Sequence, residues 1–220
     1  MDKGEKFGED LDSLVSKLGR DMREEAKESL SRLRDRLVEL HRSNVVKINH
    51  SVMELVCAKQ LVLKGHQVEV EYELGNALIC DLYAVKGDGS LIVEIETGFV
   101  PPEHALDPSL YLFARIASKI TRYSNRGGKF ALGIPPQYAL QIPEELLILP
   151  RDRTSENLKT IKSLCDLYYT SPPVSLDEVK NARLHGIYLV DVDNAVVGEI
   201  DPETCVKDNK GFLGDVTKIR

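Results

Sequence analysis

One short stretch, residues 91–96, restricts the fold more than any other part of the chain. It reads Leu-Ile-Val-Glu-Ile-Glu, and the period of two along a strand places Glu94 and Glu96 on one face together with Ile92. The stretch is otherwise so apolar that we expect it inside a sheet, where a carboxylate is costly to desolvate without a counter-charge. The sequence therefore predicts either two acids on the wet face of an antiparallel strand or a buried acid pair that needs a cation.

The segments around this stretch predict an α/β domain with a mixed sheet. A helix that ends at Gly65 precedes three strand-like runs joined by short Gly-rich turns, which indicates an antiparallel meander. Asp107 and Pro108 mark a second helix start, because an N-cap acceptor and a proline at the first helical position favour initiation. The predicted order is helix 44–64, strands 67–74, 77–85 and 90–96, helix 107–126 and strand 129–134.

Both ends of the chain are predicted as additions to this core. Apolar residues at intervals of three or four predict one long helix over residues 10–42, which fits either a dimerising coiled coil or packing on its own domain. Towards the other end, the pattern indicates a helix over 156–168, a capped helix from Ser175, and a hairpin formed by 187–192 and 195–200. The resulting division is an N-terminal helix, 1–43, a core, 44–150, and a C-terminal α/β elaboration of the same domain, 151–220.

Composition narrows the class of protein and its compartment. The chain is 42% hydrophobic and 29% charged, as in ordinary globular proteins, and its four widely spaced cysteines are predicted to be small core residues. The polar N-terminus does not resemble a secretory signal and no stretch reaches the length of a membrane span, so we expect a cytoplasmic protein with no membrane partner. Since the net charge is −6, any nucleic-acid binding would need a local basic patch.

The order of acids along the predicted elements resembles the PD-(D/E)XK nuclease superfamily. A glutamate on the first helix (Glu54), an acid on the second strand (Asp81) and the acid pair on the third strand are followed by a basic helix, within about residues 44–136. The resemblance is closest to archaeal Holliday-junction resolvases and their viral and RecB-like relatives. It implies a restriction-endonuclease-like fold, a mixed central sheet flanked by helices, with Asp81, Glu94 and Glu54 as metal ligands.

Two positions depart from the pattern of this family. Cys80 stands where the family often has a proline, and Glu96 stands where it has a lysine two residues after the acid. The cation that orients water must then come from elsewhere, and we assign this role to Lys119. His50 precedes Glu54 by one helical turn and could assist the metal. The predicted catalytic residues, with Mg²⁺ or Mn²⁺ as cofactor, are Asp81, Glu94, Glu96, Lys119 and Glu54.

The helix predicted over 107–126 carries a basic stripe. Its cations recur at i, i+4, i+7 and i+11, opposite an apolar face, so we expect them to point away from the sheet. Such a stripe is either a solvated face or a phosphate contact, and the lack of any acid within 108–143 favours phosphate. The Lys119-x-x-x-Tyr123 spacing also resembles the QxxxY signature of RecB-like nucleases. The residues predicted to contact nucleic acid are Arg115, Arg122, Tyr123, Arg126 and Lys129.

Together, these features predict a metal-dependent nuclease that hydrolyses phosphodiester bonds, an endonuclease rather than an exonuclease. The substrate implied by the resemblance is DNA, double-stranded or branched like a Holliday junction, and the expected assembly is a homodimer. Two alternatives remain open. One is a non-catalytic nucleic-acid-binding or assembly protein that retains the fold, and the other is a regulator whose helix 10–42 engages another protein.

Overall fold

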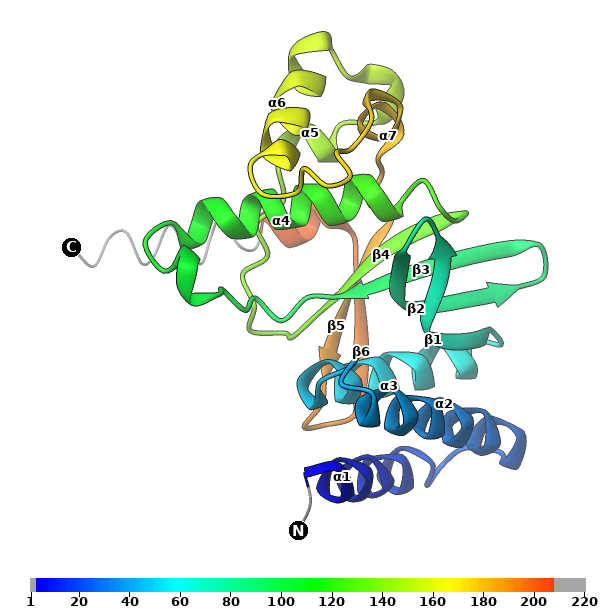
Figure 1. Cartoon of the computed structure of the whole chain (residues 1–220). Helices are drawn as coiled ribbons and strands as arrows, with labels where there is room; N and C mark the ends of the chain where they lie inside the picture. Colours follow the sequence, from blue (N-terminus) through cyan, green and yellow to red (C-terminus); the bar gives the residue numbers. More distant parts are fainter. Residues whose placement is uncertain (1–2, 208–220) are drawn as a thin grey trace.

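Six strands lie side by side in the order in which they follow along the chain, in a computed structural model that describes residues 3–207 (Figure 1). The first three form an antiparallel meander, the third, fourth and fifth are parallel, and the last two form an antiparallel hairpin. The predicted strands and the mixed α/β sheet are thereby confirmed. The strands are β1 (Gln67–Gly75), β2 (Leu78–Lys86), β3 (Gly89–Ile95), β4 (Lys129–Ile134), β5 (Gly186–Asp191) and β6 (Val196–Ile200).

Helices cover both faces of this sheet because the central strands are apolar on both sides. The helix α3 (Ile48–Leu63) packs on one face and ends at Gly65, whose φ of +83° suits a residue without a Cβ. The helix α4 (Pro108–Tyr123) lies on the opposite face (Figure 1). Alternate residues of β3 serve the two cores, as the period of two requires: Leu91, Val93 and Ile95 face the α3 side, and Ile92 faces the α4 side.

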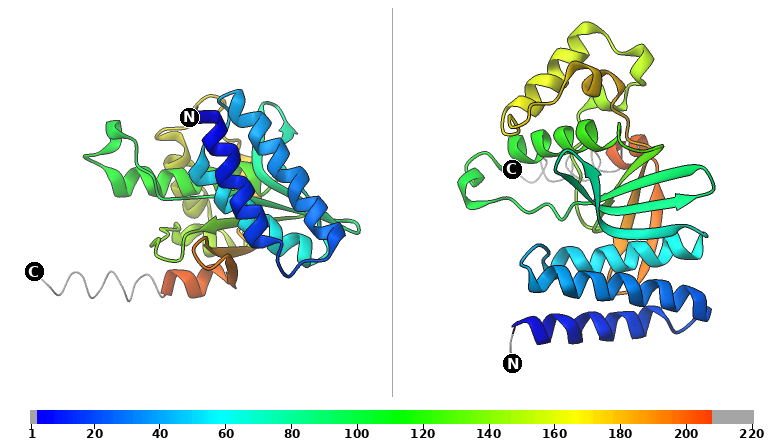
Figure 2. Two further views of the ribbon diagram at one scale, coloured as in Figure 1. Left: turned by 90° about the horizontal axis from the view of Figure 1, so that it is seen from below. Right: turned by 45° about the vertical axis from the view of Figure 1, so that its right-hand side comes forward.

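The single helix predicted over residues 10–42 is wrong, because two antiparallel helices occupy this region. The helix α1 (Lys3–Leu18) stops before a turn that begins at Gly19, and α2 (Glu24–Arg42) returns along it (Figure 2). The hairpin lets the apolar stripes of α1 and α2 join one core with α3, which one straight helix could not do. Of the two alternatives for this region, the structure shows packing on its own domain, while the predicted homodimer stays a prediction.

Two of the later helices cover α4. The helices α6 (Ser155–Asp166) and α7 (Leu176–Asn181) pack on α4, and each begins with a capping box, at Thr154 and Ser175. Three short helices link the larger elements: α5 (Glu144–Leu147), η1 (Pro102–His104) and η2 (Pro150–Asp152).

Several smaller expectations can be compared with the described residues. The predicted helix start is confirmed, with Asp107 at the N-cap and Pro108 at the first helical position, but the Asp107 side chain makes no capping hydrogen bond and accepts one from the Tyr168 hydroxyl at 2.5 Å. All four cysteines are free and buried, as predicted. Within residues 3–207, no helix combines the length and apolar character needed to span a bilayer. Residues 1–2 of the predicted N-terminal segment and residues 208–220 of the predicted C-terminal segment lie outside the described residues.

Candidate functional site

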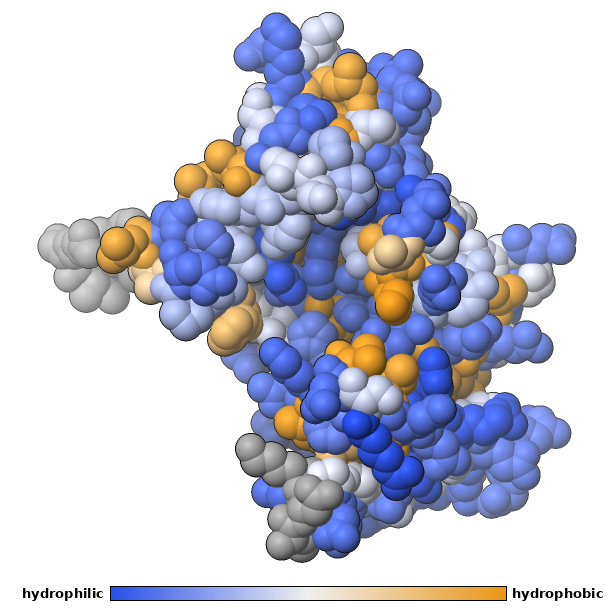
Figure 3. Space-filling model, in the orientation of Figure 1, coloured by the Kyte–Doolittle hydropathy of each residue, from blue (hydrophilic) through white to orange (hydrophobic). Residues whose placement is uncertain are grey.

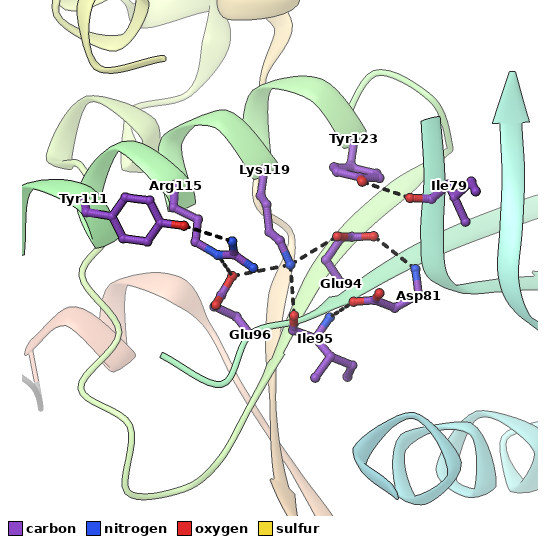
Figure 4. A network of polar contacts seen from close by, with 9 residues as sticks. All are labelled: Ile79, Asp81, Glu94, Ile95, Glu96, Tyr111, Arg115, Lys119 and Tyr123. Atoms are coloured by element: carbon purple, nitrogen blue, oxygen red, sulfur yellow. Dashed lines mark hydrogen bonds and ion pairs between the residues drawn. The ribbon is translucent and has the colours of Figure 1, made fainter. Parts of the chain in front are cut away.

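The acids gather where β2 and β3 separate. The last backbone pair between these strands joins Leu82 to Val93, although β3 continues along β4 beyond that point. Side chains then take over the hydrogen bonds: the Asp81 N–H donates to Glu94 Oε1 at 3.1 Å, and the Ile95 N–H donates to Asp81 Oδ2 at 2.5 Å (Figure 4). Two carboxylates are therefore fixed in the gap by backbone donors, and neither depends on a flexible loop for its position.

On the α3 side of this gap, three side chains that can ligate a metal ion converge. A nitrogen of His50 and carboxylate oxygens of Glu54 and Asp81 all lie within 4.8 Å of one another. Glu54 is 0% exposed, and among residues 3–207 neither of its oxygens has a hydrogen-bond partner. Burial, followed by the charges of Asp81, Glu71 and Glu94, raises the pKa of Glu54 well above its usual value. When ionised, this carboxylate needs a cation, and no Lys or Arg among residues 3–207 forms an ion pair with it.

On the α4 side, two cations reach the acid pair. Lys119 Nζ lies 3.2 Å from Glu94 Oε2 and 3.3 Å from Glu96 Oε2, and it donates to the Ile95 carbonyl at 2.9 Å. Arg115 Nε donates to Glu96 Oε2 at 2.8 Å (Figure 4). Because Glu94 and Glu96 are only 3% and 1% exposed, the alternative of a wet strand face is excluded.

Glu94 and Glu96 share a strand face, but their pKa values shift in opposite directions. Burial and the charge of Asp81 raise the pKa of Glu94 to about 8, despite the nearby Lys119. Burial also acts on Glu96, but the charges of Lys119 and Arg115 outweigh it and lower its pKa. Glu96 is thus neutralised by salt bridges and holds the two cations in place. Glu94 has one cationic neighbour, Lys119, which it shares with Glu96, so its negative charge is only partly compensated.

A further acid, Glu71 of β1, was missed by the sequence analysis. Its φ is +48°, and it interrupts the ladder opposite Asp81, between the pairs Val70 with Leu82 and Tyr72 with Cys80. Burial and the charge of Asp81 raise the pKa of Glu71 to about 7. The sequence does not distinguish Glu71 from the acids at 69 and 73, with which it alternates along the strand. In the structure, those two neighbours are exposed. Only the left-handed backbone at this position reveals it.

All five residues predicted as catalytic belong to this one cluster of charges, but the basic stripe differs from the prediction. The stripe does not point away from the protein: Arg115 binds the buried Glu96, and Arg122 donates to the Tyr169 and Pro172 carbonyls at 3.0 and 2.7 Å. Arg126 pairs with Glu178 at 3.4 Å. The partners of Arg122 and Arg126 lie far away in the sequence, in the segment between α6 and α7 and in α7 itself.

The two remaining predicted nucleic-acid contacts lie at the edges of the site. Tyr123 donates its hydroxyl to the Ile79 carbonyl at 2.9 Å and so ties the end of α4 to β2. Lys129 is exposed at the start of β4. Figure 3 shows a hydrophilic hollow between α4 and the layer of α2 and α3, the two sides that carry Lys119 and Glu54.

The donor set fits a divalent cation. Glu54 and Asp81 offer hard oxygen atoms, His50 offers a nitrogen whose pKa is lowered by burial, and Glu94 lies against the Asp81 backbone. The orphaned oxygens of Glu54 are the strongest indication, since a buried carboxylate is expensive without a counter-charge. Oxygen ligands suit Mg²⁺ and Mn²⁺, and an imidazole favours the transition metal of the two.

Comparisons with known proteins add no relative to this description. Protein-family models, curated proteins and solved structures were compared with the chain, and no match was found. What the site can do must therefore be inferred from the positions and charges of its own residues.

Proposed function

We propose that this protein is a metal-dependent nuclease that hydrolyses phosphodiester bonds on a restriction-endonuclease-like fold. The observation that carries the proposal is a group of under-compensated carboxylates, the buried Glu54 and Glu94 with the partly exposed Asp81, next to Lys119. A cluster of like charges between two packed layers is unfavourable by itself, so it indicates a role that requires a bound cation.

The metal ligands in this proposal are Glu54, Asp81 and Glu94, the three predicted from the sequence, and His50 joins them. Mg²⁺ or Mn²⁺ bound there would lower the pKa of a bound water and polarise a phosphate oxygen. The chain contributes rigidity: the backbone donors at residues 81 and 95 fix two of the carboxylates in the gap between β2 and β3. Such preorganisation allows the reaction to proceed without moving these groups.

Lys119 takes the part that the family gives to a lysine on the strand itself. Its ammonium group is held by two carboxylates and a carbonyl, so its position beside Glu94 is fixed. Burial opposes its charge, but the charges of Glu94 and Glu96 raise its pKa above the ordinary value, so it remains a cation at neutral pH. A fixed cation at this position would stabilise the negative charge that develops on the phosphate.

A cleavage assay tests the proposal. We expect cleavage of one or more of four DNA substrates, namely duplex, single-stranded, flapped and four-way, in Mn²⁺ or Mg²⁺ and not in EDTA. Asp81→Asn should abolish cleavage while its side-chain oxygen still accepts from the Ile95 N–H. Glu73→Gln, at an exposed position of β1, is the matched control and should cut like the wild type.

Two results would contradict the proposal. Cleavage by the purified Asp81→Asn protein at the wild-type rate would exclude the assigned site. Calorimetric Mn²⁺ binding that requires Asp81 and Glu54, without cleavage of any substrate, would favour the alternative of a non-catalytic nucleic-acid-binding protein.

A further inference from the structure

A small cavity lies on the α4 side of the site, apart from the converging carboxylates. Its volume is about 140 Å³, and α4 supplies most of its wall, with Tyr169 from the segment after α6 on another side. Leu78 of β2 adds an apolar side chain to the lining, and of the described residues no Asp or Glu lines the cavity. The polar lining consists of three cations, Arg115, Lys119 and Arg122, and three hydroxyl groups, Ser118, Tyr123 and Tyr169.

Two polar groups of this lining are buried without a hydrogen-bond partner in the described part of the chain. They are the Ser118 hydroxyl, on a residue that is 2% exposed, and Nε of Arg122. The thiol of Cys165 donates to the Thr121 hydroxyl at 3.7 Å; burial raises the pKa of this thiol, and its contacts with the Thr121 and Ser118 hydroxyls oppose that rise. A buried donor without a partner is costly, so Nε of Arg122 on the cavity wall indicates a missing acceptor.

The charge of the cavity also lacks a full counterpart. Arg115 and Lys119 pair with Glu94 and Glu96, but among the described residues the hydrogen bonds of Arg122 go to the neutral carbonyls of residues 169 and 172. Among the described residues, Arg122 thus has no ion pair of its own, although it shares the charge of Glu178, which pairs with Arg126. The larger cavity between α2 and β1, about 490 Å³, differs because Glu69 lines it beside its arginines.

From these observations, we propose that the cavity binds the terminal phosphate of a nucleic-acid strand. A cavity of about 140 Å³ has room for a phosphate group, since one water takes up roughly 30 Å³ in the liquid. A terminal monoester fits better than an internal diester, because it carries about −1.5 to −2 charges and its strand leaves on one side only. Arginine and hydroxyl donors are the groups that recognise phosphate.

The position of the cavity gives this contact a consequence for the reaction. Lys119 lines the cavity and also lies 3.2 Å from Glu94, so a bound phosphate would be adjacent to the acids. The inference rests on the proposed nuclease function and makes it more specific: the enzyme would select strand ends and cut near them. This differs from the endonuclease expected from the resemblance.

Fluorescence anisotropy in EDTA tests end recognition without any cleavage. Short labelled oligonucleotides with a 5′-phosphate, a 3′-phosphate or only hydroxyl ends would be compared. One phosphorylated end should bind the wild type at least about tenfold more tightly than the hydroxyl form, since charge-assisted hydrogen bonds to the terminal phosphate are lost in the latter. Inorganic phosphate at millimolar concentration should compete with that oligonucleotide.

Two variants and a control locate the effect. Arg122→Gln should remove the preference for the phosphorylated end, and Ser118→Ala should reduce it if loss of the Arg122 carbonyl contacts unfolds the first variant. Lys159→Gln, which removes one charge from an exposed position of α6, should keep the preference. Equal binding of all three oligonucleotides by the wild type would overturn the proposal.

The outcome is separable from that of the nuclease proposal. A phosphate preference without Mn²⁺-dependent cleavage would support the cavity and contradict the enzyme. Cleavage without any phosphate preference would do the reverse, and the ends of the products would then show the position of the cuts.

Discussion

Replacing Glu54 with glutamine should make the metal-free protein more stable at neutral pH and remove part of the pH dependence of its stability. Glutamine keeps the shape of the side chain and removes a buried carboxyl group whose oxygens have no partner among the described residues. The pKa of Glu54 is raised from 4.5 in the folded protein, so the folded state retains a proton that the unfolded chain releases. In the wild type, the stabilisation that comes from this proton is complete below pH 4.5, and it is lost as the pH rises towards the pKa of Glu54 in the folded protein.

The magnitude follows from proton linkage. One proton difference changes the free energy of unfolding by about 1.36 kcal/mol per pH unit, so the free energy of unfolding of the wild type should fall relative to that of Glu54→Gln by at most this amount per pH unit while folded Glu54 keeps its proton. Glu71 and Glu94, with pKa values raised to about 7 and about 8, add to the same downward trend in the wild type. In Glu54→Gln this trend should be weaker by the contribution of one group.

Urea denaturation in EDTA at pH 5, 6 and 7 would measure the difference between the two proteins. The advantage of Glu54→Gln over the wild type should grow with pH, while the exposed control Glu73→Gln should remain parallel to the wild type. Mn²⁺ should reverse the order, because the metal stabilises only the protein that keeps this ligand. Parallel curves for Glu54→Gln and the wild type would refute the reasoning that Glu54 is a buried, uncompensated acid.

The other predictions concern the neighbours of Glu54. Lys119→Met should abolish cleavage and lower the free energy of unfolding by about 3 to 5 kcal/mol in urea denaturation, because Glu94 and Glu96 lose a buried partner. Glu96→Gln should slow single-turnover cleavage, since it loosens Lys119 and Arg115; wild-type rates would leave Glu96 without a role. Glu96→Lys recreates the family's motif but opposes two cations, so its melting temperature should fall below that of Glu96→Gln. His50→Ala should weaken calorimetric binding of Mn²⁺ more than that of Mg²⁺, and an equal loss would place His50 outside the metal site.

Local patterns were sufficient for most elements of the fold. The strands, the hairpin of β5 and β6 and the capping box at Ser175 could be predicted because periodicity and turn residues act within a few positions. The hairpin of α1 and α2 could not. A turn after Leu18 and a continuous helix satisfy the same spacing of apolar residues, and only packing against α3 decides between them.

The sequence by itself determined which acids could form a site. The period of two in β3 placed Glu94 and Glu96 on one face, but it left open whether that face is wet, and only the structure shows that both are buried. What it could not determine was the charge environment of each acid, because the partners come from distant elements. Lys119 and Arg115 neutralise Glu96 from α4, while Glu54 remains without a partner among residues 3–207.

The basic stripe of α4 shows the same division between what the sequence determines and what only the tertiary structure decides. Spacing along the helix determined that its cations share one stripe, but not whether that stripe faces water. The tertiary structure decided this, because residues 155–181, from α6 to α7, fold over α4. They give Arg122 and Arg126 their partners and line one side of a cavity beside Lys119. Helical periodicity is a property of neighbouring residues, whereas the burial of a charge depends on which distant segment lies against it.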